Sequence, residues 1–211
     1  VNPATLTEMA ERAVAMAREA PEDNSVGLAQ PDQLVRDWDI DALELFDPTP
    51  EPSPKQLEID ALEAEAAALA VKGVTQVQAA SAGYSENQIH LAASNGFSGG
   101  YARTSRSISC VAISGEGLQM ERDYYGDGRV YQADLPDAAS IGTLAGERAV
   151  ARRGPRKPPT GAFPVLFDDR VSGSLISHLL SAINGSSIVR GASWLRNALG
   201  QQVLPTNMTL T

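Results

Sequence analysis

The chain has 211 residues with a net charge of −9, and 43% of them are hydrophobic, which is enough for a packed core in one domain or two small ones. Its single Cys and two His exclude an internal disulfide, a Cys-rich zinc finger and a histidine-rich metal centre. No apolar run is long enough to cross a membrane, no secretory signal is visible, and the acidic balance argues against nonspecific nucleic-acid binding.

The acidic charge is concentrated near the N-terminus. Residues 1–70 hold 16 Asp or Glu against 4 Lys or Arg, whereas residues 71–211 hold 10 against 13. The densest part, 37–51, is most simply a solvated face and linker, and the alternative is an acidic docking surface or a mimic of nucleic acid. Its apolar residues indicate that part of it packs; they are Trp38, Leu43, Leu45 and Phe46.

Two helices are predicted in the first third of the chain. Three-and-four spacing of apolar residues predicts an amphipathic helix over 4–20, and the prolines of 21–53 predict a long connection. A second helix is expected over 54–72, with Ser53 as N-cap, Gln56 completing a capping box and Gly73 ending it. Its expected buried stripe consists of Ile59, Leu62, Ala66, Leu69 and Ala70.

After Gly73 the apolar pattern changes from a helical period to a period of two. The pattern predicts an antiparallel meander with a turn at Ser85-Glu86, a type I′ turn at Asn95-Gly96 and a bulge near Gly99-Gly100. The core of the third strand, 108–113, is apolar on both faces and is expected to be covered on both. With the preceding helix this gives an α+β fold. The expected strands are 75–84, 87–94, 97–114 and 118–125.

The C-terminal third is predicted to be mainly helical. A helix is expected over 137–152, followed by a Pro- and Arg-rich linker over 153–161. A short strand over 163–167 then leads into a helix over 169–183. A last short helix, 194–199, is expected to be capped by Ser193.

Few residues form a catalytic pattern. The chain has no Gly-x-Ser-x-Gly elbow, phosphate loop, dinucleotide fingerprint or His-Glu-x-x-His. Cys110 is expected to be a buried structural thiol and His90 an ordinary strand residue. Ser174 and His178 share a helix face, but a nucleophile and base would also need an orienting carboxylate and an oxyanion hole. Ordinary helix packing is therefore the favoured interpretation of this pair.

Several ordered segments resemble one family. They are residues 95–101 (Asn-Gly-Phe-Ser-Gly-Gly-Tyr), 105–111, 120–124, 156–157, 163–167, 191–195 and 199–205. Together they are similar to the TldD/PmbA family, and most similar to its PmbA branch, also called TldE, whose proteins are often labelled modulator of DNA gyrase. Family members are longer, so the chain is expected to be a middle portion of such a protein. Its expected parts are 1–52 (the end of an N-terminal domain and an acidic linker), 53–160 (an α+β middle domain) and 161–211 (the start of a C-terminal domain).

The resemblance implies a role in proteolysis and peptide maturation. TldD and PmbA proteins resemble the two halves of a cytoplasmic hetero-oligomeric zinc metallopeptidase linked to maturing microcin. The TldD branch carries a His-Glu-x-x-x-His motif on a helix. Matching the downstream 190–193 places the two ligand positions on Ile176 and Ser181 and the glutamate on Ser177. These side chains cannot supply two imidazoles for zinc and a carboxylate for bound water, so zinc is expected only in a TldD-like partner.

The leading hypothesis is therefore a noncatalytic, cytoplasmic subunit that partners a TldD-like metallopeptidase subunit and a peptide substrate, with no metal, cofactor, nucleic acid or membrane of its own. The alternative is a stand-alone regulator that binds DNA gyrase through the acidic N-terminal part. A third hypothesis is an unrelated enzyme that uses Ser174, Ser177 and His178.

Overall fold

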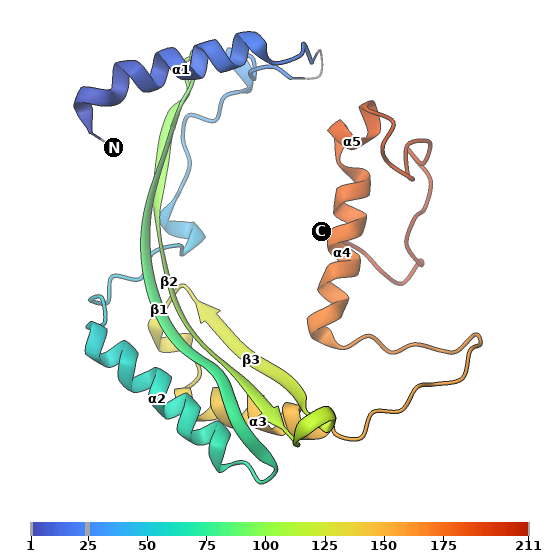
Figure 1. Cartoon of the computed structure of the whole chain (residues 1–211). Coiled ribbons are helices and arrows are strands. Elements are labelled where there is room, and N and C mark those ends of the chain that lie inside the picture. Colours follow the sequence, from blue (N-terminus) through green and yellow to red (C-terminus); the bar gives the residue numbers. More distant parts are fainter. Residues whose placement is uncertain (1, 24–25, 211) are drawn as a thin grey trace. The chain divides into compact units, whose positions relative to one another are not determined.

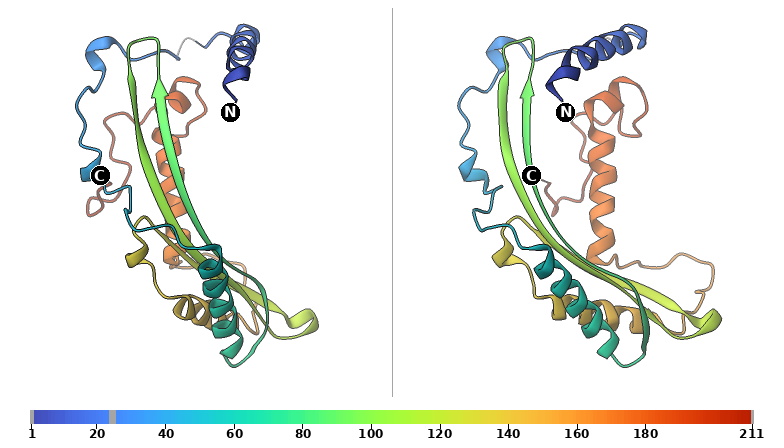
Figure 2. Two further views of the ribbon diagram at one scale, coloured as in Figure 1. Left: turned by 90° about the vertical axis from the view of Figure 1, so that its left-hand side faces the viewer. Right: turned by 60° about the vertical axis from the view of Figure 1, so that its left-hand side comes forward.

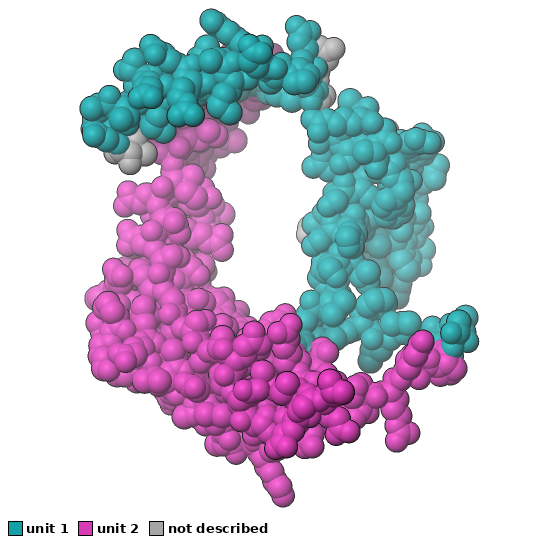
Figure 3. All heavy atoms as spheres, viewed as in Figure 1, with its two compact units in different colours: residues 1–28, 160–211 teal, residues 29–159 magenta. Residues whose placement is uncertain are grey.

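A computed structural model describes residues 2–23 and 26–210. The chain divides into two compact units (Figure 3): residues 29–159 form one, and residues 1–28 with 160–211 form the other. We call them the sheet unit and the helical unit. No described helix is both long and apolar enough to span a bilayer. Short 3-10 turns occur at Pro3–Thr5, Pro31–Gln33, Asp41–Leu43, Gly117–Gln119 and Gln132–Asp134.

The sheet unit begins its regular structure with helix α2, Pro54–Ala70. The hydroxyl of Ser53 accepts a hydrogen bond from the backbone N–H of Gln56 at 3.2 Å, as expected for an N-cap. The capping box is only half formed, because the Gln56 amide donates to Asp60 instead. Gly73, with φ +104°, turns the chain out of the helix.

Three antiparallel strands in the order β1-β2-β3 form the sheet and confirm the α+β fold. They are β1 (Val74–Ala92), β2 (Ser98–Ser114) and β3 (Glu121–Arg129). The predicted turn at Ser85-Glu86 is wrong: β1 is continuous, and both residues are paired with β2. Neither residue is a Gly or Pro, so nothing there breaks an extended backbone.

The hairpin loop and the bulges differ in detail from the sequence prediction. The backbone of Ala93 bonds to Phe97, and Gly96 takes φ +91° while Asn95 does not adopt a positive φ. The loop therefore has three residues and a left-handed glycine, not a two-residue type I′ turn. Register shifts occur at Val74/Gln76 and Val77/Ala79, and the Gly99-Gly100 pair stays in register.

Helices α2 and α3 (Ala138–Ala151) cover one face of the sheet (Figures 1 and 2). On β2, alternate residues from Thr104 to Ser114 are buried beneath them, whereas Val111 and Ile113 on the other face are only half-buried. The expectation that both faces are covered is wrong for the sheet unit. The core consists of Ala64, Ala68, Ile108, Cys110, Ala112, Ala138, Ile141, Ala145 and Ala149.

Small residues set the spacing between the two helices. A Cβ on Gly142 would overlap the backbone carbonyl of Ala64, and one on Gly146 would press on Val71. The alanine face of α2 therefore turns inward, because only Ala and Gly allow this approach. The predicted stripe containing Ile59, Leu62 and Leu69 lies on the opposite, exposed side of α2.

The acidic segment that precedes α2, residues 37–51, is hydrogen-bonded to β2. Residues 98–105 of β2 have no β3 partner, and there the backbone N–H of Thr104 donates to the carbonyl of Leu45 at 3.1 Å. The buried carboxylate of Asp47 accepts from the backbone N–H of Gln132 at 2.7 Å, while the N–H of Asp47 donates to the Thr104 hydroxyl at 2.9 Å. These bonds hold the acidic segment along the strand edge.

The helical unit contains α1 (Leu6–Glu19), α4 (Asp169–Ile183) and α5 (Gly185–Val189). Residues 163–167 are not a strand, and residues 194–199 are turns rather than a helix. The last helix forms earlier because Asn184 caps it by accepting from the N–H of Ser186 at 3.0 Å. The hydroxyl of Ser193 accepts from the N–H of Leu195, but no helix follows.

Replacing Gly142 with Ala tests the contact between α2 and α3. The new methyl group overlaps the Ala64 backbone, so we expect a loss of about 1–3 kcal/mol in the free energy of unfolding. Gly128→Ala is the control, because its Cβ would meet only an ordinary contact at 3.6 Å. Urea denaturation measures both, and equal midpoints for the two variants would contradict the packing model.

Replacing Asp47 with Asn tests the anchor of the acidic segment through pH. The hydrogen bond from the Gln132 backbone, despite opposing desolvation, lowers the pKa of Asp47 below its ordinary 3.8. The charged carboxylate therefore stabilises the fold above that value, and this contribution is lost as the pH falls through the folded pKa. We expect Asp47→Asn to be less stable than the parent at pH 6, with the gap narrowing towards pH 2.5. A gap that stays constant or widens in acid would count against this role.

Candidate functional site

Helix α4 carries the positions matched to the metal motif. Ile176 is half-buried, and Ser177 and Ser181 are exposed. The Ser177 hydroxyl donates to the carbonyl of Gly173 at 3.0 Å, and the Ser181 hydroxyl donates to the carbonyl of Ser177 at 2.9 Å. An Ile side chain has no lone pair to offer, and both hydroxyls are used inside the helix. This set of side chains does not fit a zinc ion.

The other reactive residues of α4 do not form a catalytic pair. The Ser174 hydroxyl donates to the carbonyl of Val171, one turn back, rather than to His178. Both Ser174 and His178 are exposed, so neither packs in a core. Across residues 2–23 and 26–210, no three His, Cys, Asp or Glu side chains gather closely enough to hold a metal ion.

The remaining sequence candidates lie on the sheet. Cys110 is fully buried, and burial raises the pKa of its thiol, which keeps it protonated at neutral pH. The Nε2 atom of His90 lies 3.2 Å from the Ser98 hydroxyl near the end of the hairpin, and no carboxylate contact accompanies this pair among the described residues. Neither residue has the surroundings of a nucleophile or a general base.

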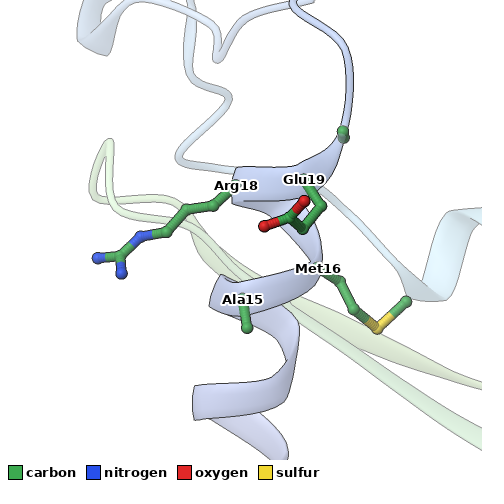
Figure 4. Close-up of a pocket in the computed structure, with 5 residues that line it drawn as sticks. Ala15, Met16, Arg18 and Glu19 are labelled. Carbon is green, nitrogen blue, oxygen red and sulfur yellow. The ribbon is translucent and has the colours of Figure 1, made fainter.

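A depression on α1 is also not a reactive site. It is lined by Ala15, Met16, Arg18, Glu19 and Ala20, all at the C-terminal end of one helix. Figure 4 shows Arg18 and Met16 extending to different sides of this helix. The side chains do not converge on a common point, so the depression offers no arrangement for chemistry.

An apolar cavity lies in the sheet unit, where the β1-β2 hairpin extends past the residues that pair with β3. Figures 1 and 2 show the preceding segment running alongside this part of the hairpin. The cavity is about 320 Å³ in volume and almost entirely apolar. We call it the hairpin cleft. Its lining residues are Trp38, Ile40, Leu43, Ile89, Leu91, Phe97, Gly99, Gly100 and Tyr101.

Two contacts build the hairpin cleft. The Trp38 indole packs directly on the backbone of Gly99, where any side chain would collide with it. The rings of Trp38 and Phe97 are tilted by 36° with centroids 5.5 Å apart, a favourable aromatic geometry. The sequence predicts packing around Trp38 but not the contribution of Ile89 and Leu91 to the cleft. The sequence signal for these two residues is their spacing of two along β1, which places both side chains on one face of the strand.

A second hollow adjoins the hairpin cleft and shares Ile40 with it. It is about 310 Å³ in volume and contains two carboxylates, those of Asp41 and Glu44. Phe46 and Tyr131 supply aromatic walls. We call it the acidic hollow. The two cavities place an apolar surface next to a negatively charged one.

Comparison with known proteins identifies the family. A family model described as the PmbA/TldA metallopeptidase central domain matches residues 45–153, and the corresponding C-terminal domain model matches residues 160–211. The metalloprotease PmbA of Escherichia coli O157:H7 is 31% identical over all 211 residues of this chain and 46% of its own length. The chain thus spans less than half of that relative.

Solved structures agree on the fold. A Bacteroides thetaiotaomicron protein described as a suggested modulator of DNA gyrase superposes with a TM-score of 0.83 at 27% identity, over 96% of this chain and 46% of that one. TldE from Thermococcus kodakarensis gives a TM-score of 0.64 at 20% identity, over 94% of this chain and 44% of that one, and so shares the fold. Because the central-domain model alone covers more than half of the residues, the chain belongs to the PmbA/TldD metallopeptidase family.

Proposed function

We propose that this chain is part of a noncatalytic PmbA-type subunit that works beside a TldD-type metallopeptidase subunit in peptide processing. One observation carries the proposal. The α4 positions matched to the zinc motif hold Ile176, Ser177 and Ser181, and both hydroxyls bond to carbonyls of their own helix. Zinc-dependent hydrolysis needs imidazole ligands and a carboxylate base, so the partner must supply them.

The sheet unit offers a surface suited to such a supporting role. Among the described residues, no strand pairs with the outer edge of β1, whose nineteen residues from Val74 to Ala92 include one charge, Glu86. A long edge with little charge and no Pro is well suited to pairing with another extended segment. The same proposal places the protein in the cytoplasm. It also divides the chain into the end of an N-terminal domain with a linker (1–52), a middle domain (53–160) and the start of a C-terminal domain (161–211).

Reconstitution with a partner tests this function. Tagged full-length protein should recover a protein containing His-Glu-x-x-x-His from extracts of its own cells. Metal analysis should find stoichiometric zinc in the complex and in the isolated partner but not in this subunit. Tightly bound zinc in the isolated subunit would overturn the proposal.

A variant of His178 separates the proposal from a serine-based mechanism. Because Ser174 bonds to Val171 and not to His178, His178→Ala should leave peptide hydrolysis by the reconstituted complex within about twofold of the parent. The control is a Glu→Gln change in the partner's own motif, which should abolish hydrolysis. Loss of activity in His178→Ala, with the complex still assembled, would favour the serine-based alternative.

A regulator of DNA gyrase is the second candidate function. The exposed carboxylates of Asp37, Asp39, Asp41 and Glu44 support it, as does the description of the Bacteroides protein. A surface of this charge would bind a basic partner more tightly at low salt. Failure of the full-length protein to co-elute with purified gyrase at low ionic strength would eliminate this candidate.

A further inference from the structure

We propose that the hairpin cleft and the acidic hollow together bind an extended peptide segment that carries a large apolar side chain beside a Lys or Arg. The inference concerns the surface of this chain and stands apart from the proposed partnership. Its basis is that the two cavities share Ile40, and that one is lined by apolar residues while the other also carries two carboxylates.

The hairpin cleft has the size and lining for one large apolar side chain. Its volume of about 320 Å³ lies at the lower end of the range of ligand sites. Leu91 and Leu43 are each 61% exposed, although both face the cavity. Covering them with an aromatic or branched side chain would remove apolar surface from water, which favours binding.

The acidic hollow specifies the charge of the neighbouring ligand group. In the described part of the chain, neither Asp41 nor Glu44 takes part in a salt bridge, and both are exposed. Residues 36–51 contain six carboxylates and one basic residue, Arg36. A cation entering the hollow would meet both carboxylates and the rings of Phe46 and Tyr131, which also favour cations.

Local structure fixes the backbone at Asp41 and Glu44 before any ligand binds. The side chain of Asp39 accepts a hydrogen bond from the N–H of Ala42 at 3.0 Å, within the short turn Asp41–Leu43. Glu44 ends this turn in a left-handed conformation, φ 48°, with its N–H bonded to the carbonyl of Asp41. Preorganisation of this kind lowers the entropy lost on binding.

The anchor at Thr104 fixes the acidic hollow against the strand. Leu45 lines the hollow and accepts a hydrogen bond from the Thr104 backbone, and Ala102 of the same strand forms part of its wall. The next even position on β2, Gly100, belongs to the hairpin cleft. The two cavities therefore follow one strand, as an extended peptide with successive side chains would require.

Fluorescence anisotropy with defined peptides tests the proposal on the full-length protein. The probe is fluorescein-labelled Gly-Ser-Ala-Lys-Trp-Lys-Ala-Ser-Gly at about 50 mM salt, where screening is weak. One comparison peptide replaces Trp by Ala, and another replaces both Lys by Glu. We expect the probe to bind at least about tenfold more tightly than either comparison peptide, because each loses one half of the recognition.

Matched variants locate the binding. Leu91→Gln should weaken probe binding about tenfold, while Leu69→Gln on the exposed side of α2 should not change it. The pair Asp41→Asn and Glu44→Gln should reduce both the affinity and its salt dependence, with Glu63→Gln on α2 as the charge control.

Three outcomes would overturn the proposal. The first is equal binding, or no binding, of the three peptides. The second is equal loss in the Leu91 and Leu69 variants. The third is self-association of the parent that Leu91→Gln abolishes in sedimentation while the probe fails to bind, which would assign the hairpin cleft to a second copy of this chain.

Discussion

The close approach of α2 to α3 is the constraint on which the sheet unit depends. Gly142 lies against the backbone of Ala64, so the helices meet through alanine and glycine rather than through interleaved large side chains. A core built this way is thin. Helices α2 and α3 cover the part of the sheet in which β3 pairs with residues 106–114 of β2. The rest of the hairpin, which includes residues 98–105 of β2, must pack against another segment.

The acidic segment supplies those partners. Leu45 and Asp47 bond to Thr104, and Trp38 packs on Gly99, so a stretch that is polar overall becomes the lining of an apolar cleft. The buried Asp47 carboxylate makes the attachment specific, since its two acceptor oxygens bond to the backbone N–H groups of Thr49 and Gln132. The carboxylates of the acidic segment are therefore of two kinds: Asp47 is buried and structural, and the others are exposed.

The local chemistry of α4 is the basis of the proposed function. A helix stands where the resemblance places the metal motif, but its side chains close their hydrogen bonds within the helix. What the chain presents outward is an edge strand with little charge and two adjoining cavities.

The sequence by itself determined the local elements: the cap at Ser53, the left-handed Gly73 and the change of period that marks the α+β sheet. It also identified the family, because several segments match the family's residue patterns in the same order. The exposed side of α2, the continuity of β1 through Ser85 and Glu86, and the union of Trp38 with Ile89 and Leu91 were decided by tertiary structure. Helical periodicity identifies apolar faces, but which face is buried depends on how closely a distant helix can approach. Likewise, Trp38 and Ile89 lie about fifty positions apart in the sequence but line one cleft. They do so because the edge of β2 that β3 does not pair must form hydrogen bonds with another segment.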